Sequence, residues 1–270
     1  MKYIITGSIV LFKNDPEEIL KTINCFLKIN LESKLYLIDN SPTNDLSNLI
    51  QDSRVEYIFN NNNVGFGAGH NIALRICENI SHYHLVLNPD ITFLNGTVEK
   101  MVSHFKSNLD IGIMMPKILN YDNSVQYLPK LLPSPFILIL RKFPFSSKIR
   151  NIILNKYELR NPSNNTSFYS PVISGCFSLI NLSILKEVGF YDEKYFMYFE
   201  DWDFSRRIYL KYKTLYFVEA SVYHGYRSEA NYKLRLLNIF IKSAIRYFSK
   251  WGWFFDNERR KINKEVLNQF

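Results

Sequence analysis

Blocks of hydrophobic residues alternate with polar segments along the first half of the chain and predict strands and helices in turn. Residues 4–12 form an apolar run typical of a buried strand. Residues 15–18, Asp-Pro-Glu-Glu, provide a helix N-cap, a proline at the first helical position and two acids that complement the helix dipole. Apolar residues recur at helical spacing from 19 to 27, and residues 34–38 form a second apolar run. This β-α-β order predicts an α/β protein.

Polar residues follow the predicted strands at the points where these end. Asp39 and Asn40 come directly after the run at 34–38, and Asn88-Pro89-Asp90 follows a strand predicted at 83–87. Ligands of open α/β sheets bind outside the carboxyl ends of the strands, where loops present polar groups without breaking the ladder. The pattern therefore predicts a binding site formed by these strand ends.

The rest of the chain continues the alternation after a third early strand, and one long segment interrupts it. The segment at 120–170 contains several prolines and an Asn-rich patch, which is typical of a variable insertion. The strand predicted at 172–180 is interrupted by Ser174-Gly175-Cys176. The remaining predicted elements are strands at 55–59, 111–115 and 215–218 and helices at 96–107, 183–188 and 200–212.

Length and charge define one large body and a basic tail. A chain of 270 residues supports one large α/β domain with an appended segment. The formal net charge is +8, and residues 230–270 hold nine Lys or Arg against three Asp or Glu, so the tail carries +6 of it. The nearly neutral body and the absence of a nucleic-acid motif argue against nucleic-acid binding.

The cysteines and the hydropathy pattern point to a cytoplasmic location. Cys25, Cys77 and Cys176 are an odd number without CxxC spacing, which argues against a disulfide framework or a zinc knuckle. The apolar run near the N-terminus is short and lacks a small-residue cleavage site, so we interpret it as a strand and not as a signal peptide. No apolar stretch reaches about 18 residues, the length of a membrane span. Any membrane contact is expected to be peripheral, at the inner face of the plasma membrane.

The Asn88-Pro89-Asp90 turn is the first candidate for chemistry. Its carboxylate leaves a buried strand at a turn forced by proline. Hard oxygen ligands suit Mg²⁺ or Mn²⁺, and these ions use one or two carboxylates together with substrate phosphates. The alternative is an aspartate that only caps a turn.

The second candidate is the acidic run at 198–203, Tyr-Phe-Glu-Asp-Trp-Asp, which opens a predicted helix. Acids in a first helical turn often do no more than complement the helix dipole. Asp203 and Arg207 stand four residues apart and are expected to pair on the helix surface. Asp201 has no such partner and is expected to project into a cleft with aromatic walls. Such an environment raises the pKa of a carboxyl toward the range of a general base.

Two further motifs are less specific. Residues 63–71, Asn-Val-Gly-Phe-Gly-Ala-Gly-His-Asn, resemble a phosphate-cradling turn but lack the lysine and hydroxyl of a P-loop. We interpret this stretch as a loop that leads into a helix from about Asn71 and whose amides face a ligand. His224 follows an apolar strand, and a single histidine is usually an ordinary hydrogen-bonded residue unless its surroundings supply other ligands.

Taken in order, these segments resemble family 2 glycosyltransferases, particularly the branch of bacterial rhamnosyltransferases that act in O-antigen and capsule assembly. The resemblance implies the GT-A fold, a Rossmann-like mixed central sheet flanked by helices. It also implies a catalytic domain at 1–229, with a nucleotide-sugar half at 1–115 and an acceptor half at 116–229, followed by a helical tail at 230–270. The matching segments are 8–12 (SIVLF), 37–41 (LIDNS), 63–71 (NVGFGAGHN), 87–90 (LNPD), 173–177 (ISGCF), 198–203 (YFEDWD) and 223–224 (YH).

The resemblance also implies roles for individual residues in an inverting transfer. Asp201 would be the general base and Glu200 would position the acceptor. A divalent cation, Mg²⁺ or Mn²⁺, would be held by Asp90 and His224. The other implied contacts are Asp39, Asn71, Asn88 and Asp90 on the donor side and Ser174, Gly175 and Trp202 on the acceptor side.

One position departs from the family. Asn88 stands where the family often has aspartate, which removes one negative charge from the expected cation site. Cation affinity is then expected to depend on Asp90, His224 and the nucleotide, and to be weak without nucleotide.

The resemblance favours L-rhamnose from dTDP-rhamnose as the transferred sugar and a lipid-linked or soluble glycan as the acceptor. A UDP-hexose donor is the alternative within the same fold. A degenerate module that holds a nucleotide sugar or glycan without turnover is the alternative outside enzymes, and the presence of Asp90, Asp201 and His224 argues against it.

The tail has two interpretations. Residues 232–255 interleave basic residues with apolar ones and end in an aromatic cluster, which predicts a basic amphipathic helix. Such a helix can lie in an anionic membrane interface. It can equally pack on the catalytic domain or form a homodimer.

Overall fold

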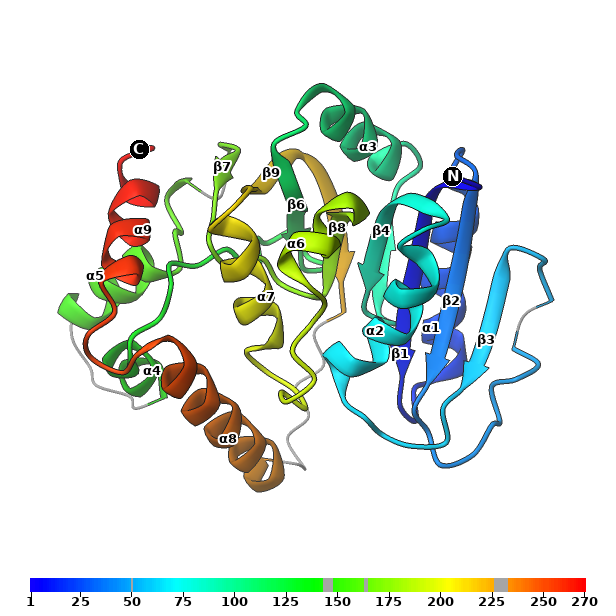
Figure 1. Cartoon of the computed structure of the whole chain (residues 1–270), viewed down its shortest axis with the longest axis horizontal. Helices are drawn as coiled ribbons and strands as arrows, with labels where there is room; N and C mark the ends of the chain where they lie inside the picture. The colour runs from blue at the N-terminus through cyan, green and yellow to red at the C-terminus, as the bar shows by residue number, and fades with distance from the viewer. Residues whose placement is uncertain (50, 143–147, 163–164, 226–232) are drawn as a thin grey trace.

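The computed structural model describes residues 1–49, 51–142, 148–162, 165–225 and 233–270. Within these residues, nine strands form one mixed sheet with helices on its faces (Figure 1). The strands are β1 Tyr3–Leu11, β2 Ser33–Asp39, β3 Val55–Phe59, β4 Ser81–Leu87, β5 Ile91–Phe93, β6 Ile111–Leu119, β7 Phe168–Tyr169, β8 Phe177–Asn181 and β9 Lys213–His224. The helices are α1 Pro16–Leu27, α2 Phe66–Cys77, α3 Thr97–Ser107, α4 Pro135–Lys142, α5 Lys148–Tyr157, α6 Leu185–Val188, α7 Glu200–Tyr209, α8 Lys233–Trp251 and α9 Asn257–Leu267.

The sheet order is β3-β2-β1-β4-β8-β6-β9-β5, and β7 pairs with β9. Strands β3, β2, β1 and β4 are parallel, whereas β8 runs antiparallel to both β4 and β6. The predicted α/β class with a mixed central sheet is therefore confirmed. The carboxyl ends of β1, β2 and β4 lie at one edge, so the polar residues after β2 and β4 come to the same side of the molecule.

Most helices and strands in the first half of the chain lie where local sequence signals predicted them. Helix α1 begins at Pro16, and the side chain of Asp15 accepts a hydrogen bond from the Glu17 amide at 2.9 Å. Ile19, Ile23 and Phe26 line the buried face of α1 and are 0% exposed. Together with the apolar strand residues they form one continuous core, and its burial is the main stabilising contribution.

Helix α2 begins at Phe66, whereas the sequence predicted a start near Asn71. The glycines permit close packing here. A Cβ on Gly67 would lie 2.9 Å from Tyr191, and one on Gly69 would lie 2.8 Å from Val10. The glycine-rich stretch is therefore the first turn of a helix that approaches its neighbours closely.

The segment at 120–170 contains two helices that the periodicity did not resolve, and the tail contains the predicted helix, α8, followed by a second one. Helices α4 and α5 lie within the predicted insertion, and α9 follows α8 in the tail. In Figure 1 these four helices gather at one end of the molecule. No helix within the described ranges is long and apolar enough to cross a membrane.

The tail packs on the body through both of its helices. Tyr247 and Phe248 of α8 form a cluster with Phe199 and with Leu138 of α4. In α9, Ile262 joins the main core and is 4% exposed. The inner face of α8 thus packs on the body, as one of the two interpretations of the tail expected.

Candidate functional site

The Asn88-Pro89-Asp90 turn is fixed by contacts from three elements. The Thr22 hydroxyl of α1 donates to the Pro89 carbonyl at 2.6 Å and also contacts the Ile91 carbonyl at 2.8 Å. The Gly225 amide, which follows β9, donates to the Asp90 carbonyl at 3.0 Å. The backbone on either side of Asp90 is therefore held, and the carboxylate has a defined position.

His224 at the end of β9 faces this turn, and a hydrogen-bond network sets its tautomer. The Gln126 amide nitrogen donates to the Asn120 side-chain oxygen at 2.7 Å and to the His224 carbonyl at 3.1 Å. The Gln126 amide oxygen is therefore the group that faces His224 Nδ1, at 2.9 Å, so Nδ1 carries the hydrogen. His224 Nε2 then carries the lone pair, which accepts a hydrogen bond from the Asn88 side-chain amide at 3.2 Å.

Asp90 supplies a second acceptor at the same place. Its Oδ1 is buried without a hydrogen-bond partner among the described residues and lies 3.4 Å from His224 Nε2. Two acceptor atoms that face each other repel unless a proton or a cation lies between them. The pair therefore fits a divalent cation. The other imidazole nitrogen, Nδ1, donates to Gln126, and metal-ligating histidines usually make such a hydrogen bond. No three His, Cys, Asp or Glu side chains gather as a metal cluster within the described ranges, so a cation here would need ligands from a substrate.

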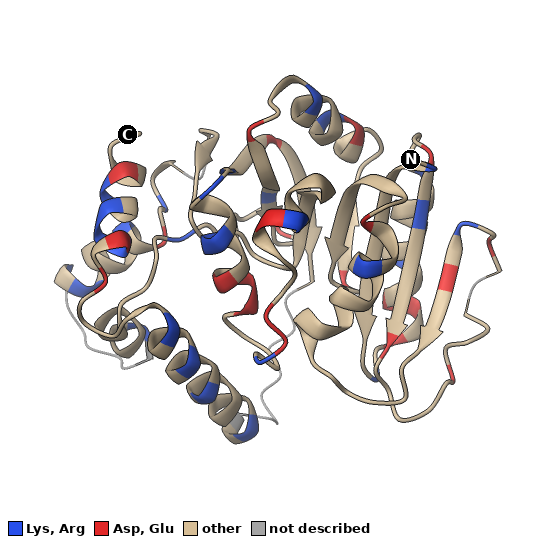
Figure 2. Cartoon of the chain, in the orientation of Figure 1, with Lys and Arg blue, Asp and Glu red and all other residues tan. Residues whose placement is uncertain are grey.

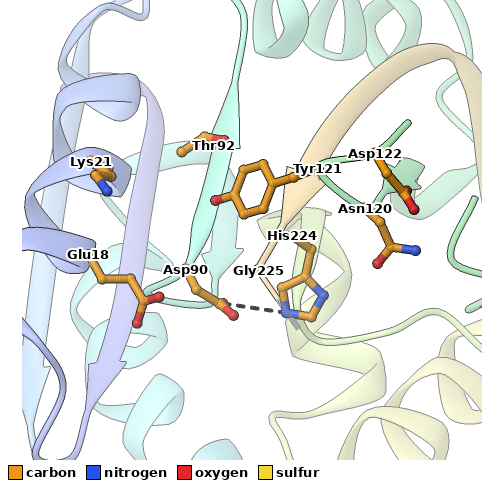
Figure 3. A pocket seen from close by; sticks show the side chains of 9 residues that line it. All are labelled: Glu18, Lys21, Asp90, Thr92, Asn120, Tyr121, Asp122, His224 and Gly225. Carbon is orange, nitrogen blue, oxygen red and sulfur yellow. Dashed lines mark ion pairs between the residues drawn. The ribbon is translucent and has the colours of Figure 1, made fainter. Parts of the chain in front are cut away.

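A cavity of about 600 Å³ opens beside Asp90 and His224. Figure 3 shows the two side chains next to each other, joined by a dashed line, among the residues that line this cavity, with Glu18 and Lys21 on α1. The cavity is large enough for a nucleotide portion or a sugar. Its remaining lining residues are Thr92, Asn120, Asp122 and Gly225.

Asp201 and Glu200 form the second part of the site at the start of α7. One Asp201 oxygen accepts a hydrogen bond from the Gly175 amide at 3.1 Å, and the other accepts from the Trp202 amide at 2.9 Å. Burial raises the pKa of Asp201 to about 6, and the nearby charge of Lys130 and the amide hydrogen bonds limit the rise. Burial and the negative charge of Asp201 raise the pKa of Glu200 well above its usual range.

Glu200 is 5% exposed, and its Oε2 has no hydrogen-bond partner among the described residues. The backbone before it is unusual, because Tyr198 and Phe199 both have a φ of 69°, in the left-handed region. Large aromatic residues occupy this region only where packing compels them to. The adjacent acids therefore sit on a backbone that the surrounding structure holds in place.

Helix α8 supplies much of that support. The Ser243 hydroxyl donates to the Met197 carbonyl at 2.8 Å, and the Trp251 indole donates to Asp203 at 2.8 Å. The predicted pairing of Asp203 with Arg207 is confirmed at 2.9 Å, but Asp203 is 0% exposed and does not lie on the helix surface as expected. The inner face of the tail thus fixes both ends of the acidic run.

A short segment at 174–176 connects the two parts of the site. The Cys176 carbonyl accepts from the Asn88 amide at 2.8 Å, while the Gly175 amide contacts Asp201. A side chain on Gly175 would lie 2.7 Å from Phe66. The Asp90 turn and the Asp201 carboxylate therefore flank one segment, as a donor side and an acceptor side would.

Two of the residues expected on the donor side, Asn71 and Asp39, make contacts within the chain. Asn71 is 0% exposed, and its amide bonds both the backbone of Tyr191, at 2.9 and 3.0 Å, and the Glu193 carboxylate, at 2.9 Å. Asp39 is 0% exposed and accepts from the Tyr57 hydroxyl at 2.7 Å and the Ser41 amide at 2.8 Å. In this structure, Asn71 ties α2 to the loop before α7, and Asp39 orders the end of β2.

The glycine-rich stretch also differs from the expectation that its amides face a ligand. The Gly65 amide bonds the Asn63 side chain at 3.2 Å, and the Phe66 amide bonds the Phe196 carbonyl at 2.9 Å. The Gly69 amide donates back to the Gly65 carbonyl at 3.2 Å. These amides are occupied within the chain because the stretch has become the start of a packed helix.

The structure therefore brings Asn88, Asp90 and His224 together, and Glu200, Asp201, Gly175 and Trp202 together. Ser174 precedes Gly175 of the second group, and its hydroxyl accepts from the Cys176 amide at 3.4 Å. Gln126 was missed, because a glutamine inside a segment without periodicity carries no signal in the sequence. Only the fold shows that it faces His224.

The family model described as "Glycosyl transferase family 2" matches residues 8–189. A low-salt glycan biosynthesis hexosyltransferase, Agl10, of Haloferax volcanii is 25% identical over 202 residues, which cover 74% of this chain and 60% of that relative. The chain thus spans about three fifths of the length of this curated relative. The family match ends before Glu200, Asp201 and His224.

Solved structures share the fold at low sequence identity. GalNAc-T7 with UDP, GalNAc and Mn²⁺ has a TM-score of 0.61 at 15% identity and covers 84% of this chain and 44% of that chain. The mannosyltransferase PcManGT of Pyrobaculum calidifontis, in complex with GDP-Man and Mn²⁺, has a TM-score of 0.59 at 10% identity. The match covers 100% of this chain and 75% of that chain. TarS of S. aureus, residues 1–349, has a TM-score of 0.58 at 13% identity. The match covers 99% of this chain and 71% of that chain.

Proposed function

Because this chain belongs to glycosyl transferase family 2, we propose that it transfers a sugar from a nucleotide diphosphate donor to a glycan acceptor with inversion. The observation that carries the proposal is the pair of sites on either side of residues 174–176. One side holds the unpartnered Asp90 oxygen beside His224, and the other holds Asp201 with a raised pKa. An inverting displacement needs a base on the acceptor and a positive charge at the leaving diphosphate.

In this mechanism Asp201 takes the proton of the acceptor hydroxyl while that oxygen attacks the anomeric carbon. The Gly175 and Trp202 amides orient the carboxylate, and Glu200 beside it positions the acceptor. Asp90 and His224 would hold a divalent cation, with Asn88 beside them. When bound, the cation would supply the charge that stabilises the departing diphosphate. Two structural neighbours in complex with Mn²⁺ support this choice of cation.

Within this activity we propose dTDP-rhamnose as the donor and surface polysaccharide assembly as the pathway, on the basis of the ordered motifs. A UDP-hexose is the second candidate, and the similarity to a hexosyltransferase favours it. Sugar selectivity depends on the shape of the pocket beside Asp90, so direct binding measurements are needed to separate the two.

Nucleotide binding is expected to depend on Mn²⁺ and on Asp90. In calorimetric titrations of dTDP, UDP and GDP, one nucleotide should bind more tightly with Mn²⁺. The Asp90→Ala variant should lose this gain, on the order of 100-fold, because the cation loses a protein ligand that stabilises it by several kcal/mol. Gln126→Leu should weaken the same gain by about 10–100-fold, because His224 is no longer oriented.

Exposed acids provide the control for this experiment. Asp110→Ala removes an exposed carboxylate that does not line this cavity, and it should leave the Mn²⁺ effect intact. If Asp90→Ala binds nucleotide in Mn²⁺ as tightly as the wild type, Asp90 is not a ligand of the cation. If no nucleotide binds the wild type, the chain is a degenerate module and glycan binding becomes the next test.

Transfer is expected to fall in acid, because Asp201 must be ionised to accept a proton. Its pKa of about 6 predicts that kcat/KM decreases tenfold per pH unit below about pH 6. Above that pH the base is ionised and the rate should reach a plateau. Initial rates between pH 4.5 and 8 would measure this, with nucleotide affinity followed over the same range to separate loss of binding from loss of the base. A rate independent of pH down to pH 4.5 would contradict the role of Asp201.

A lipid-linked acceptor lies at a membrane, and residues 230–255 are the segment that could make a peripheral contact with it. The outward face of α8 pairs aliphatic with basic residues at successive turns, as in Ile241-Lys242 and Ile245-Arg246. Figure 2 shows Lys and Arg along α8 without an acid. We propose that this face lies on an anionic membrane at the cytoplasmic side and presents the site to a lipid-linked acceptor.

Substitution of Ile241 and Ile245 by serine is expected to weaken binding to vesicles that contain phosphatidylglycerol by at least about tenfold. Ile241 is 47% and Ile245 is 49% exposed, and each side chain contributes about 1.5 kcal/mol when it enters an apolar phase. Sedimentation with vesicles measures this. Leu109→Ser is the control, since Leu109 is 80% exposed but precedes β6. Equal loss in both variants would argue against a specific role of α8.

A further inference from the structure

Two adjacent acids, Glu200 and Asp201, begin α7, and the proposed transfer uses one of them as a base. Glu200 is 5% exposed, and Asp201 is half-buried. Moving a carboxylate out of water costs free energy unless a cation or hydrogen-bond donors replace the water. Two negative charges on neighbouring residues also repel each other. The partners of each carboxyl therefore determine how many charges this acid pair, Glu200 and Asp201, carries.

The backbone donors beside the acid pair are directed at Asp201. The Gly175 amide donates to one Asp201 oxygen at 3.1 Å, and the Trp202 amide donates to the other at 2.9 Å. The Ser205 hydroxyl lies 3.1 Å from the Ile173 carbonyl and 2.6 Å from the Asp201 carbonyl, which holds the segment before Gly175 against α7. Both oxygens of Asp201 therefore have a fixed donor when the carboxylate is charged.

A buried ammonium group also favours a charge on Asp201. Lys130 is 7% exposed, and its Nζ donates to the Tyr127 and Leu128 carbonyls at 2.9 and 3.2 Å. Its backbone pairs with Val172, at the start of the segment that leads to the Asp201 contact. Burial lowers the pKa of Lys130 to about 8, so the group is mostly charged at neutral pH. Burial raises the pKa of Asp201, and the charge of Lys130 opposes that rise.

Glu200 lacks comparable partners among the described residues. Its Oε2 is buried without a hydrogen-bond partner, and no basic side chain in the described ranges forms an ion pair with it. Its Cβ faces α2, where a Cβ on Gly67 would lie 3.4 Å away. Burial and the negative charge of Asp201 raise the pKa of Glu200, and its own backbone amide opposes this in part. A carboxyl in such a place is more stable with its proton.

The other titratable groups of the described residues around the acid pair are uncharged or already paired. Burial raises the pKa of a phenol or a thiol and lowers that of an imidazole, so such groups stay neutral near pH 7. Lys250 and Arg207 both pair with Asp203, at 2.7 and 2.9 Å. The groups that burial keeps neutral are His70, Tyr157, Cys176 and Tyr191. These groups do not supply Glu200 with a positive charge.

We propose that Glu200 is a neutral carboxylic acid in the working protein and that Asp201 carries the single negative charge of the acid pair. The consequence for catalysis rests on the proposed transfer function. A second charge on Glu200 would disfavour the ionised form of Asp201 and so remove the base at neutral pH. Glu200 is then a positioning residue that acts through Asp201. It keeps its own proton, while Asp201 accepts the proton of the acceptor hydroxyl.

The first test determines the protonation state from stability and needs no substrate. A carboxyl with a raised pKa in the folded chain makes the wild type lose stability as the pH rises above about 4.3, the value of a free glutamate. Glu200→Gln has no such proton to lose. The ratio of the folding equilibrium constants of variant and wild type should therefore increase about tenfold per pH unit from about pH 5, until Glu200 ionises in the folded chain. Urea denaturation at several pH values between 5 and 8 measures this ratio.

Glu219→Gln is the matched control, because Glu219 is exposed on β9. Its ratio should not depend on pH. Glu200→Ala should show the same pH dependence as Glu200→Gln, so the test holds even if one of the two variants folds poorly. A flat ratio for the Glu200 variants would mean that Glu200 ionises near its ordinary pKa, and this result would overturn the proposal.

The second test is the pH dependence of transfer. Glu200→Gln keeps the shape and the neutrality of the acid, so the pH at which kcat/KM falls to half should match that of the wild type. If Glu200 were charged, its removal would relieve the repulsion on Asp201 and lower this pH by about one unit or more. Glu200→Ala should lose at least about tenfold more kcat/KM than Glu200→Gln, because the base is then less well held.

A lower half-rate pH in Glu200→Gln would overturn the proposal, and equal rates of the two variants would remove Glu200 from the role of positioning residue. If the wild type transfers no sugar from any donor, the proposed function fails. The stability ratio still decides the protonation state of Glu200 in that case, so the two failures are distinguishable.

Discussion

Replacement of Asp201 by asparagine is expected to lower the rate of transfer by about 10²–10⁴-fold, the usual contribution of a general base. The amide keeps the shape of the side chain and its oxygen can still accept from the Gly175 amide, but its nitrogen replaces the oxygen that accepts from the Trp202 amide and the group cannot take a proton. Donor affinity should change little, because the base acts on the acceptor and not on the diphosphate. The measurement is kcat with saturating donor, beside calorimetric titration of the nucleotide in Mn²⁺.

Asp110→Asn serves as the control for this variant. It makes the same chemical change at a carboxylate that is 56% exposed and pairs with Lys213 at the start of β9. Its rate should equal that of the wild type. A variant at Asp201 that transfers at the normal rate, or that loses nucleotide affinity to the same degree as kcat, would remove Asp201 from the role of base.

The second large effect concerns stability and the tail. Asp256 caps α9 and makes two hydrogen bonds with Arg206 of α7, at 2.7 and 2.8 Å, while the two side chains are 4% and 1% exposed. Asp256→Ala is expected to lower the free energy of unfolding by about 3–5 kcal/mol, because it leaves a buried guanidinium without its partner. Urea denaturation followed by circular dichroism measures this.

Asp110→Ala breaks an ion pair with exposed partners and should change stability little. A comparable loss in the two variants would mean that the contact between α7 and α9 does not stabilise the body. Because α7 carries Glu200 and Asp201, the same contact links the tail to the acidic part of the site. The Asp256→Ala variant should therefore also show weaker transfer at temperatures where it remains folded.

The tail and the candidate site are structurally connected through α7 and α8. Trp251 and Ser243 of α8 hold the acidic run from outside, and the outward face of the same helix carries the proposed membrane contact. A helix that touches both the base-bearing segment and a membrane would keep the site ordered where a lipid-linked acceptor is found. The serine variants of α8 would therefore reduce transfer to a membrane acceptor more than transfer to a soluble one.

The sequence by itself determined the elements whose signals are local. Proline after Asp15, the helical spacing of apolar residues in α1 and the continuous apolar runs of β1 and β4 specify these elements within a few residues of chain. The polar residues after β2 and β4 also indicated the edge of the sheet where the candidate site lies. Asp90 and Asp201 were recognisable because each follows a local pattern, a strand end with a proline turn and an acid at a helix start.

Only the tertiary structure decided the contacts between residues far apart in the chain. Asn71 lies in a glycine-rich motif, yet its partners at Tyr191 and Glu193 are about 120 positions away and bury it. Gln126 and His224 are 98 positions apart, and no local pattern relates them. Hydrogen bonding and close packing act between neighbours in space, whereas periodicity records only neighbours in sequence. The sequence therefore indicated the candidate residues, and the fold decided which of them line a cavity and which are held in internal contacts.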